Sequence, residues 1–249
     1  MNDEAEVNEN HAALLRFLIE LRRRVVRCVF LVAVLLLITI FFANHLYTLL
    51  ALPLLRHLPQ GHLIATEVAA PFFVPFKLAL VAALLLAVPY FLYQLWAFIA
   101  PALYSHERSR LWPLLLVSTF LFYGGMAFAY FVIFPVLFGF FAKTAPEGVT
   151  FSPDIGHYLD MTLKLLFIFG GLFEVPVAMM LLVWSGVVTR QRLIKLRAYA
   201  IVGAFIIGMM LAPPDVFSQT VLAVPLWLLY EVGIILSRFF EKSVDLTLE

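Results

Sequence analysis

Charged residues are scarce in this chain. Only 13% of its 249 residues are Asp, Glu, Lys or Arg, and 63% are hydrophobic, whereas a soluble domain has about 25% charged residues. A water-soluble single domain is therefore excluded. The one cysteine, Cys28, allows no intramolecular disulfide and no cysteine-based metal or redox motif. The formal net charge of +1 excludes nucleic acid as a partner held by bulk electrostatics.

Enzyme motifs are also missing from the sequence. The six histidines fall in expected loops or at helix ends, and there is no H-E-x-x-H, no G-x-S-x-G and no Gly-rich phosphate loop. No nucleophile with a neighbouring base is visible at membrane depth. The sequence therefore predicts a protein that is not an enzyme and has no metal site and no cofactor.

Long apolar runs dominate what is present. The segments 28–55, 78–106 and 111–142 contain no Asp, Glu, Lys or Arg, and each exceeds the roughly 20 residues that a helix needs to cross a bilayer. In the second half of the chain, single acids interrupt similar runs. The pattern predicts an all-α polytopic membrane protein with six transmembrane helices. The expected helices are 25–46, 72–98, 113–137, 161–185, 198–212 and 216–236.

Several features indicate an irregular bundle. The fifth expected helix reaches only about 22 Å at about 1.5 Å per residue, short of the about 30 Å hydrocarbon core, so the bilayer is expected to thin there or the chain to turn within it. Prolines inside the spans predict kinked or broken helices. The segments 47–71 and 138–160 predict periplasmic caps packed on the bundle. The prolines well inside spans are Pro75, Pro89, Pro176 and Pro225.

Lys and Arg residues are distributed unequally between the two ends of the expected bundle. One end has Arg56 and Lys143, and Lys77 and Lys164 lie near outer span ends. The positive-inside rule places the richer end, and with it both termini, in the cytoplasm. This predicts a cytoplasmic segment 1–24, a transmembrane domain 25–236 and a cytoplasmic tail 237–249. The richer end has Arg16, Arg22, Arg23, Arg24, Arg27, Arg108, Arg110, Arg190, Arg192, Lys195, Arg197, Arg238 and Lys242.

Two acids flank the cytoplasmic ends of the first three expected spans. Glu20 lies among arginines before the first span, and Glu107 follows the second. Each acid either binds a ligand at the membrane surface or has a purely structural role. Glu20 can pair with Arg24 one helical turn later, and Glu107 can stay solvated beside Arg108. On the pattern alone, both interpretations stay open.

Glu174 lies near the middle of the fourth expected span, where a charge costs on the order of 3 kcal/mol. It either pairs within the bundle or serves helix docking or transport. Gly170 and Gly171 share its helix face, so a neighbouring helix could approach closely beside it. Three further polar residues fit helix capping or interhelical hydrogen bonding: Asp215, Gln94 and Gln219.

Five short segments carry a resemblance to a known family. They are 18–22 (LIELR), 98–108 (FIAPALYSHER), 124–131 (GGMAFAYF), 173–177 (FEVPV) and 213–219 (PPDVFSQ). Together they resemble the TatC family, the multispanning subunit of the twin-arginine protein translocase. The resemblance covers about residues 14–240, and the segments fall in order on the six expected helices. Phe17 stands where the family usually has histidine.

The resemblance implies a receptor in the bacterial inner membrane for signal peptides of already folded proteins. It implies recruitment of the single-span partners TatA and TatB, self-association in a larger complex, and use of the protonmotive force without nucleotide hydrolysis. The implied signal-peptide site comprises Glu20, Arg22, Phe98 and Glu107. The implied intramembrane polar residues for partner docking are Glu174, Gln94 and Gln219, and the implied periplasmic turns contain Pro53 and Asp215.

Carboxylates at the cytoplasmic surface suit a ligand with paired arginines. A carboxylate can bind the planar fork of a guanidinium through two hydrogen bonds, which lysine cannot reproduce. The main alternative function is a proton-coupled secondary transporter of small molecules, because broken helices and a midplane carboxylate are typical of that class. No inverted repeat is evident, however, and a purely structural scaffold would leave Glu174 unexplained.

Overall fold

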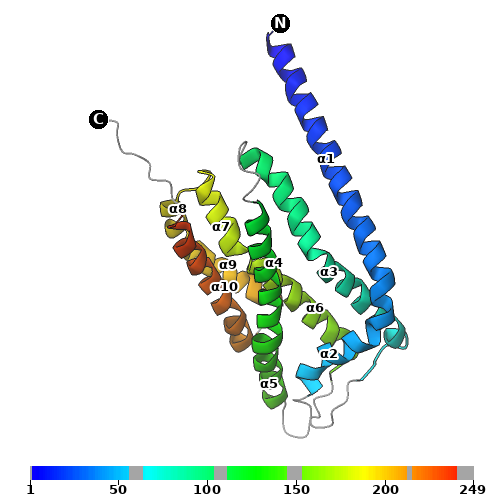
Figure 1. Ribbon diagram of the computed structural model, residues 1–249. Helices are drawn as coiled ribbons and strands as arrows, with labels where there is room; N and C mark the ends of the chain where they lie inside the picture. The colour runs from blue at the N-terminus through cyan, green and yellow to red at the C-terminus, as the bar shows by residue number, and fades with distance from the viewer. Residues whose placement is uncertain (1, 56–63, 104–110, 145–152, 212–214, 240–249) are drawn as a thin grey trace.

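The structure is a computed structural model that describes residues 2–55, 64–103, 111–144, 153–211 and 215–239. Within these residues the chain is helical, with no β-strand and one isolated bridge between Ile64 and Asp154. Figure 1 shows an elongated bundle with the long first helix at one edge. The elements are α1 (Asn2–Thr39), η1 (Ile40–Phe42), α2 (Ala43–Leu55), α3 (Ala70–Leu103), α4 (Leu111–Phe128), the π-helical turn η3 (Ala129–Ile133), α5 (Phe134–Thr144), α6 (Ile155–Leu172), α7 (Val175–Trp184), α8 (Arg190–Lys195), α9 (Arg197–Leu211) and α10 (Val216–Ser237).

Among the described residues, five helical stretches are long and apolar enough to cross a bilayer. They are Leu18–Leu52, Ala70–Ala97, Trp112–Thr144, Ile155–Trp184 and Val216–Ser237. A sixth apolar helix, α9, has 15 residues and is too short to span about 30 Å without help from the bilayer or its neighbours. The expected all-α membrane fold is confirmed, and the short fifth span is where the sequence predicts it.

The first helix is much longer than expected. The sequence predicts its start at residue 25, but α1 begins at Asn2 and runs without a break past residue 24. Residues 2–24 are rich in Glu, Ala, Leu and Arg, which are good helix formers whether or not they lie in a membrane. Hydropathy shows only where the apolar part of a helix lies. A run of good helix formers can continue the same helix beyond that part.

The spans are interrupted at three places in the described residues. Between α6 and α7 the fourth span breaks at residues 173–174, next to Pro176, as a proline in a helix predicts. Of the other two interruptions, η1 contains no proline, whereas η3 ends two residues before Pro135, the same spacing that Pro176 has from the break at 173–174. At the first, the hydroxyl group of Thr39 donates a hydrogen bond to the carbonyl oxygen of Ala79 on α3, at 2.8 Å. The helices continue through Pro75, Pro89 and Pro225.

The helix α2 caps one end of the bundle, as expected for the first part of 47–71, of which residues 56–63 lie outside the described residues. Two tyrosine hydroxyl groups hold it, since Tyr130 donates to the carbonyl oxygen of Leu49 at 2.7 Å and Tyr158 to that of Leu50 at 2.6 Å. The second expected cap, 138–160, is different. Its residues 138–144 continue α5 and 155–160 open α6, while 145–152 lie outside the described residues.

Asp154 joins α6 to the segment before α3. Its carboxylate accepts hydrogen bonds from the backbone and hydroxyl group of Thr66, at 2.9 and 2.8 Å, and from the backbone N–H groups of Gly156 and His157. These donors, Thr66 first, hold the pKa of Asp154 well below its usual range. The carboxylate therefore stabilises this junction at neutral pH, and the stabilisation is lost only in strong acid.

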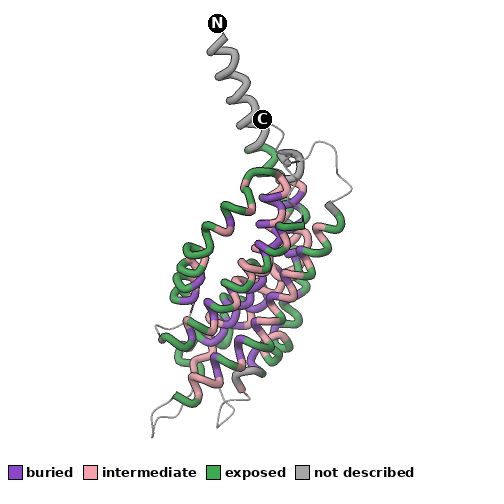
Figure 2. The backbone as a smooth tube through the Cα atoms, turned by 90° about the vertical axis from the view of Figure 1, so that its left-hand side faces the viewer, coloured by how far each residue is buried: buried purple, intermediate pink, exposed green. Residues whose placement is uncertain are grey.

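The outer surface of the bundle is apolar, as lipid contact requires. Figure 2 shows buried residues along the helix sides that face one another and exposed residues on the outer sides. Large side chains such as Phe41 and Phe120 are 85% and 79% exposed. The core contains Phe134, Phe169 and Leu165, which are fully buried. This distribution fits a multi-pass membrane protein.

Candidate functional site

Glu20 lies on α1 and is paired with an arginine one helical turn later. Arg24 donates to one carboxylate oxygen of Glu20, Oε1, from Nη2 at 2.6 Å and from Nε at 3.1 Å. The second oxygen, Oε2, accepts no hydrogen bond from the described residues. The Glu20 side chain is 53% exposed. The i,i+4 ion pair considered in the sequence analysis is therefore present.

The same arginine connects α1 to α3. Arg24 Nη1 donates to the side-chain Oε1 of Gln94 at 2.9 Å and to its backbone carbonyl oxygen at 3.3 Å, and Nη2 donates to the carbonyl oxygen of Ala97 at 3.4 Å. Gln94 is buried and the Arg24 side chain is 19% exposed. Gln94 thus forms the expected interhelical hydrogen bond. Arg24 binds both Glu20 and Gln94, so it connects Glu20 to the last turns of α3.

The other residues predicted for this site are described less completely. Arg22 is exposed on α1 and has no hydrogen bond or ion pair with the described residues. Phe98 lies on α3, four residues after Gln94, and Glu107 lies outside the described residues. The structure therefore brings Glu20 and Gln94 together through Arg24, next to the turn of α3 that carries Phe98.

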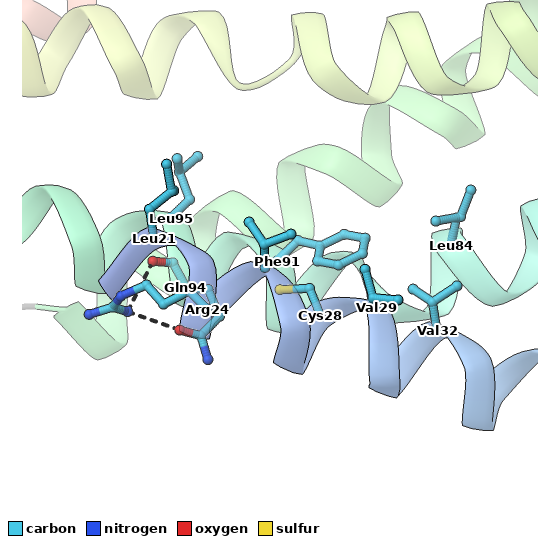
Figure 3. Close-up of a pocket in the computed structure, with 10 residues that line it drawn as sticks. Leu21, Arg24, Cys28, Val29, Val32, Leu84, Phe91, Gln94 and Leu95 are labelled. Carbon is cyan, nitrogen blue, oxygen red and sulfur yellow. Dashed lines mark hydrogen bonds between the residues drawn. The ribbon is translucent and has the colours of Figure 1, made fainter. Parts of the chain in front are cut away.

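An apolar pocket of about 470 Å³ lies between α1 and α3. Figure 3 shows Arg24 and Gln94 at one end of its lining and Val32 and Leu84 at the other. Apart from Arg24 and Gln94 the lining is apolar, so the pocket places apolar surface directly beside the charged contact. The remaining lining residues are Leu21, Val25, Cys28, Val29, Phe91 and Leu95.

Glu174 occupies the break between α6 and α7. It takes the N-cap position of α7 but forms no capping bond with its side chain, and both carboxyl oxygens are buried without a hydrogen-bond partner in the described part of the chain. Ser118 on α4 neighbours this carboxyl group, and its hydroxyl oxygen accepts a hydrogen bond from Trp96 Nε1 at 3.1 Å. A buried carboxyl group without a partner is costly, so it is a candidate for contact with another molecule.

The glycines beside Glu174 have different environments. Gly170 faces α4 of the same chain, where an added Cβ atom would lie 2.7 Å from Phe122 Cζ. The expected close approach of a neighbouring helix is therefore present at Gly170, and that helix is α4 of the same chain, which fills the space. Gly171 has no atom within 4 Å of an added Cβ atom, so of these two glycines it is Gly171 that leaves room for a further helix beside Glu174.

Asp215 and Gln219 have the structural roles considered for them. The carboxylate oxygen Oδ1 of Asp215 caps α10 by accepting from the Ser218 N–H at 2.7 Å. Gln219 Nε2 donates to the carbonyl oxygen of Phe205 at 3.1 Å and so links α10 to α9. Pro53 lies within α2. No group of three or more potential metal ligands occurs among the described residues.

The geometry is that of a membrane protein with a charged contact at one end of two spans and a buried carboxyl group in a broken span. A family model described as Sec-independent protein translocase protein (TatC) matches residues 16–225. The chain belongs to the TatC family. Curated relatives extend over nearly the same length, so the match is not confined to one motif.

Individual TatC proteins are highly similar to this chain. It is 54% identical to Sec-independent protein translocase protein TatC of Escherichia coli (strain K12) over 93% of this chain and 90% of that protein. It is 51% identical to the Haemophilus influenzae protein of the same name, over 93% and 91%. A solved structure called Crystal Structure of Twin Arginine Translocase Receptor- TatC is 38% identical, with a TM-score of 0.82 over 90% of this chain and 99% of that one.

Membership of the TatC family decides between the functions considered. The chain is a component of the twin-arginine, Sec-independent protein translocase and a multi-pass protein of the inner membrane. The small-molecule transporter is not supported. TatC works in a translocase complex with other subunits.

Sequence reasoning missed two contacts of this TatC chain. Arg24 is expected only as a partner of Glu20, since nothing in the spacing indicates that it also binds Gln94, 70 residues away. Glu231 is a further acid within a span, and it accepts a hydrogen bond from Arg197 at 2.8 Å. Both contacts join residues far apart in sequence, and an alternation of apolar and polar residues carries no sign of them.

Proposed function

We propose that this TatC chain is the receptor subunit that binds twin-arginine signal peptides of folded proteins at its cytoplasmic face. Glu20 and Glu107 bind the two arginines, and Arg22 and Phe98 complete the site. The observation that supports this most is the contact of Glu20 with Arg24, because this carboxylate already accepts a guanidinium through two hydrogen bonds. Charge-assisted bonds of this kind are the stronger ones in proteins.

The orientation of the chain is part of the proposal. Thirteen of its Lys and Arg residues flank one end of the bundle and two flank the other, and this asymmetry supports cytoplasmic termini. The segment 1–24 and the tail 237–249 then lie in the cytoplasm, and α2 lies at the periplasmic surface. Glu20 and the end of α3 face the compartment in which folded precursors carry their signal peptides.

Thiol labelling tests this orientation. In a chain with Cys28 replaced by alanine, cysteines introduced within 60–65 and 147–150 are expected to react with an impermeant thiol reagent added outside the cytoplasmic membrane. A cysteine in place of Gln191, just after the start of α8, is expected to react only after the membrane is opened. Labelling of the Gln191 position in intact cells would overturn the orientation and the six-helix topology.

Partner recruitment is assigned to the intramembrane polar residues. Glu174 offers a buried carboxyl group with Ser118 as its polar neighbour and no hydrogen bond within the described residues, and Gly171 leaves room for a helix beside it. A single-span subunit such as TatA or TatB that carries a polar residue would gain a hydrogen bond that lipid cannot provide. Gln94 and Gln219 already bind within the chain, so Glu174 is the main candidate for docking.

Reconstitution tests the proposed function as a whole. Vesicles that contain this chain with TatA and TatB are expected to bind a twin-arginine precursor and to transport it when a protonmotive force is applied without nucleotide. A matched precursor with two lysines is expected to bind far more weakly, because an ammonium group lacks the guanidinium fork. Equal binding of both precursors would contradict the proposal.

A further inference from the structure

We infer that Lys164 on α6 binds a carboxylate carried by the membrane helix of a partner subunit. The inference deepens the proposed function and rests on it, since the partner is the single-span subunit assigned to Glu174. It adds a second, charged contact on the same span, about 15 Å along the chain axis from Glu174 at about 1.5 Å per residue. It also states what this partner must carry, which is an acid inside its membrane helix.

Lys164 lies well inside its helix. The sequence predicts a fourth span that begins at residue 161, which would put Lys164 near its end, but α6 begins at Ile155. Lys164 is therefore about 14 Å along α6 from the first residue of the helix. All of α6 belongs to the apolar stretch Ile155–Trp184, which is long enough to cross the bilayer. A lysine within such a stretch is costly in lipid, and residues of this kind mark functional contacts.

The charge of Lys164 is not balanced by the described part of the chain. Lys164 is exposed and has no hydrogen bond or ion pair with the residues that the structure describes. The one acid of α6, Asp160, lies one helical turn earlier and is bound by Lys77 of α3. That pair is already neutral, so the ammonium group of Lys164 needs a counter-ion from outside the bundle.

The surface around Lys164 is suited to a second helix. His157, Lys164 and Gly171 are the exposed residues of α6, and they recur every seven residues, so they form one stripe along the helix. An added Cβ atom at Gly171 would have no atom within 4 Å, and small residues of this kind let helix backbones approach closely. Lys164 and Gly171 are about 10 Å apart along α6, so one straight helix can contact both.

Docking along this stripe changes what Lys164 can bind. In the free chain its flexible stem can extend toward lipid phosphates at the end of the bundle that carries α2, where α6 begins. A partner helix seated against Gly171 would cover Lys164 and separate it from those phosphates. A buried charge without a counter-ion is strongly unfavourable. The partner therefore has to supply a carboxylate, about two helical turns from its contact with Gly171 and toward the end that carries α2.

Crosslinking in vesicles that contain the full chain and either TatA or TatB tests the inference. The chain with Cys28 replaced by alanine carries a cysteine at Ile168, one turn from Lys164 on α6, and the partner carries one cysteine in its membrane helix. In Lys164→Gln the crosslinked fraction at limiting partner is expected to fall about threefold or more, because the charged contact is lost. Lys164→Arg keeps the charge and is expected to keep most of the crosslinking.

Lys143→Gln is the matched control. Lys143 is an exposed lysine in the last turn of α5, so its replacement removes the same charge from a different helix. It is expected to leave the crosslinked fraction unchanged. Unchanged crosslinking in Lys164→Gln as well would show that Lys164 binds only lipid phosphates, and it would overturn the inference.

A charge exchange identifies the acid and guards against a folding defect. Lys164→Glu is expected to lose most of the crosslinking, because two carboxylates would then face each other. Replacement of one acid in the partner helix by lysine is expected to restore it, since the ion pair is then present in reverse. If no such exchange in TatA or TatB restores crosslinking, the inference is wrong.

Glu174→Ala separates this inference from the proposed function. Loss of crosslinking in Glu174→Ala, together with normal crosslinking in Lys164→Gln, would leave the proposed docking at Glu174 intact and reject only the role of Lys164. Normal crosslinking in Glu174→Ala would reject the proposed docking itself.

Discussion

Glu20→Gln is expected to weaken binding of a twin-arginine signal peptide by about tenfold or more, because a charge-assisted hydrogen bond contributes about 1.5–3 kcal/mol. Glutamine keeps the size of the side chain and one carbonyl oxygen but loses the charge and the two-oxygen contact. The measurement is fluorescence anisotropy of a labelled peptide with the full chain in nanodiscs. The loss is expected to shrink at high salt, since the site is exposed at the membrane surface.

Glu107 is expected to behave in the same way. Glu107→Ala should reduce the affinity by about tenfold or more, and Glu107→Gln nearly as much, because the charge provides most of the contact. Glu231→Gln is a matched control, since Glu231 also binds an arginine of the chain, Arg197, but lies on α10, far along the chain from the proposed site. Full affinity in both Glu107 variants would reduce Glu107 to a solvated loop residue.

Glu174→Ala is expected to abolish most transport while peptide binding stays close to normal. The alanine removes the buried carboxyl group beside the break between α6 and α7, and with it the polar contact offered to a partner helix. Transport of a precursor into vesicles and crosslinking of TatA or TatB to the fourth span are both expected to fall. Glu174→Gln should retain much of both, because an amide donates and accepts hydrogen bonds in a similar volume.

Signal-peptide binding distinguishes docking from recognition at Glu174. If Glu174→Ala loses peptide binding but crosslinks normally to its partners, Glu174 belongs to the recognition site and the separate roles are wrong. Gly171→Leu is a second probe, because the space beside Gly171 is open in the monomer. It should reduce partner crosslinking without reducing the stability of the chain.

The spans could be predicted because their signal is local. Each apolar run exceeds the thickness of a bilayer, and the short α9 and the break next to Pro176 follow from residues that are neighbours in sequence. The ion pair of Glu20 with Arg24 is local too, since the two residues are one helical turn apart. The start of α1 at Asn2 could not be predicted from hydropathy, because hydropathy does not show where the polar part of a helix begins.

Contacts between distant segments could not be predicted from one sequence. The bond from Arg24 to Gln94 depends on how α1 packs on α3, and the bond from Arg197 to Glu231 on how α9 packs on α10. Likewise, the closeness of α4 to Gly170 is a property of the packed bundle. Side-chain periodicity shows which face of a helix is apolar, and it does not show which helix will cover that face.

Disulfide crosslinking tests the central claim most directly. The chain with Cys28 replaced by alanine receives one cysteine at Ile19, beside Glu20, or at Phe41, near the other end of the same span; both positions are exposed. A precursor carries a cysteine next to its arginine pair. The account predicts a crosslink to the Ile19 position that disappears when the two arginines are replaced by lysines, and none to the Phe41 position. A crosslink to Phe41 alone, or one to Ile19 that is indifferent to the arginines, would contradict it.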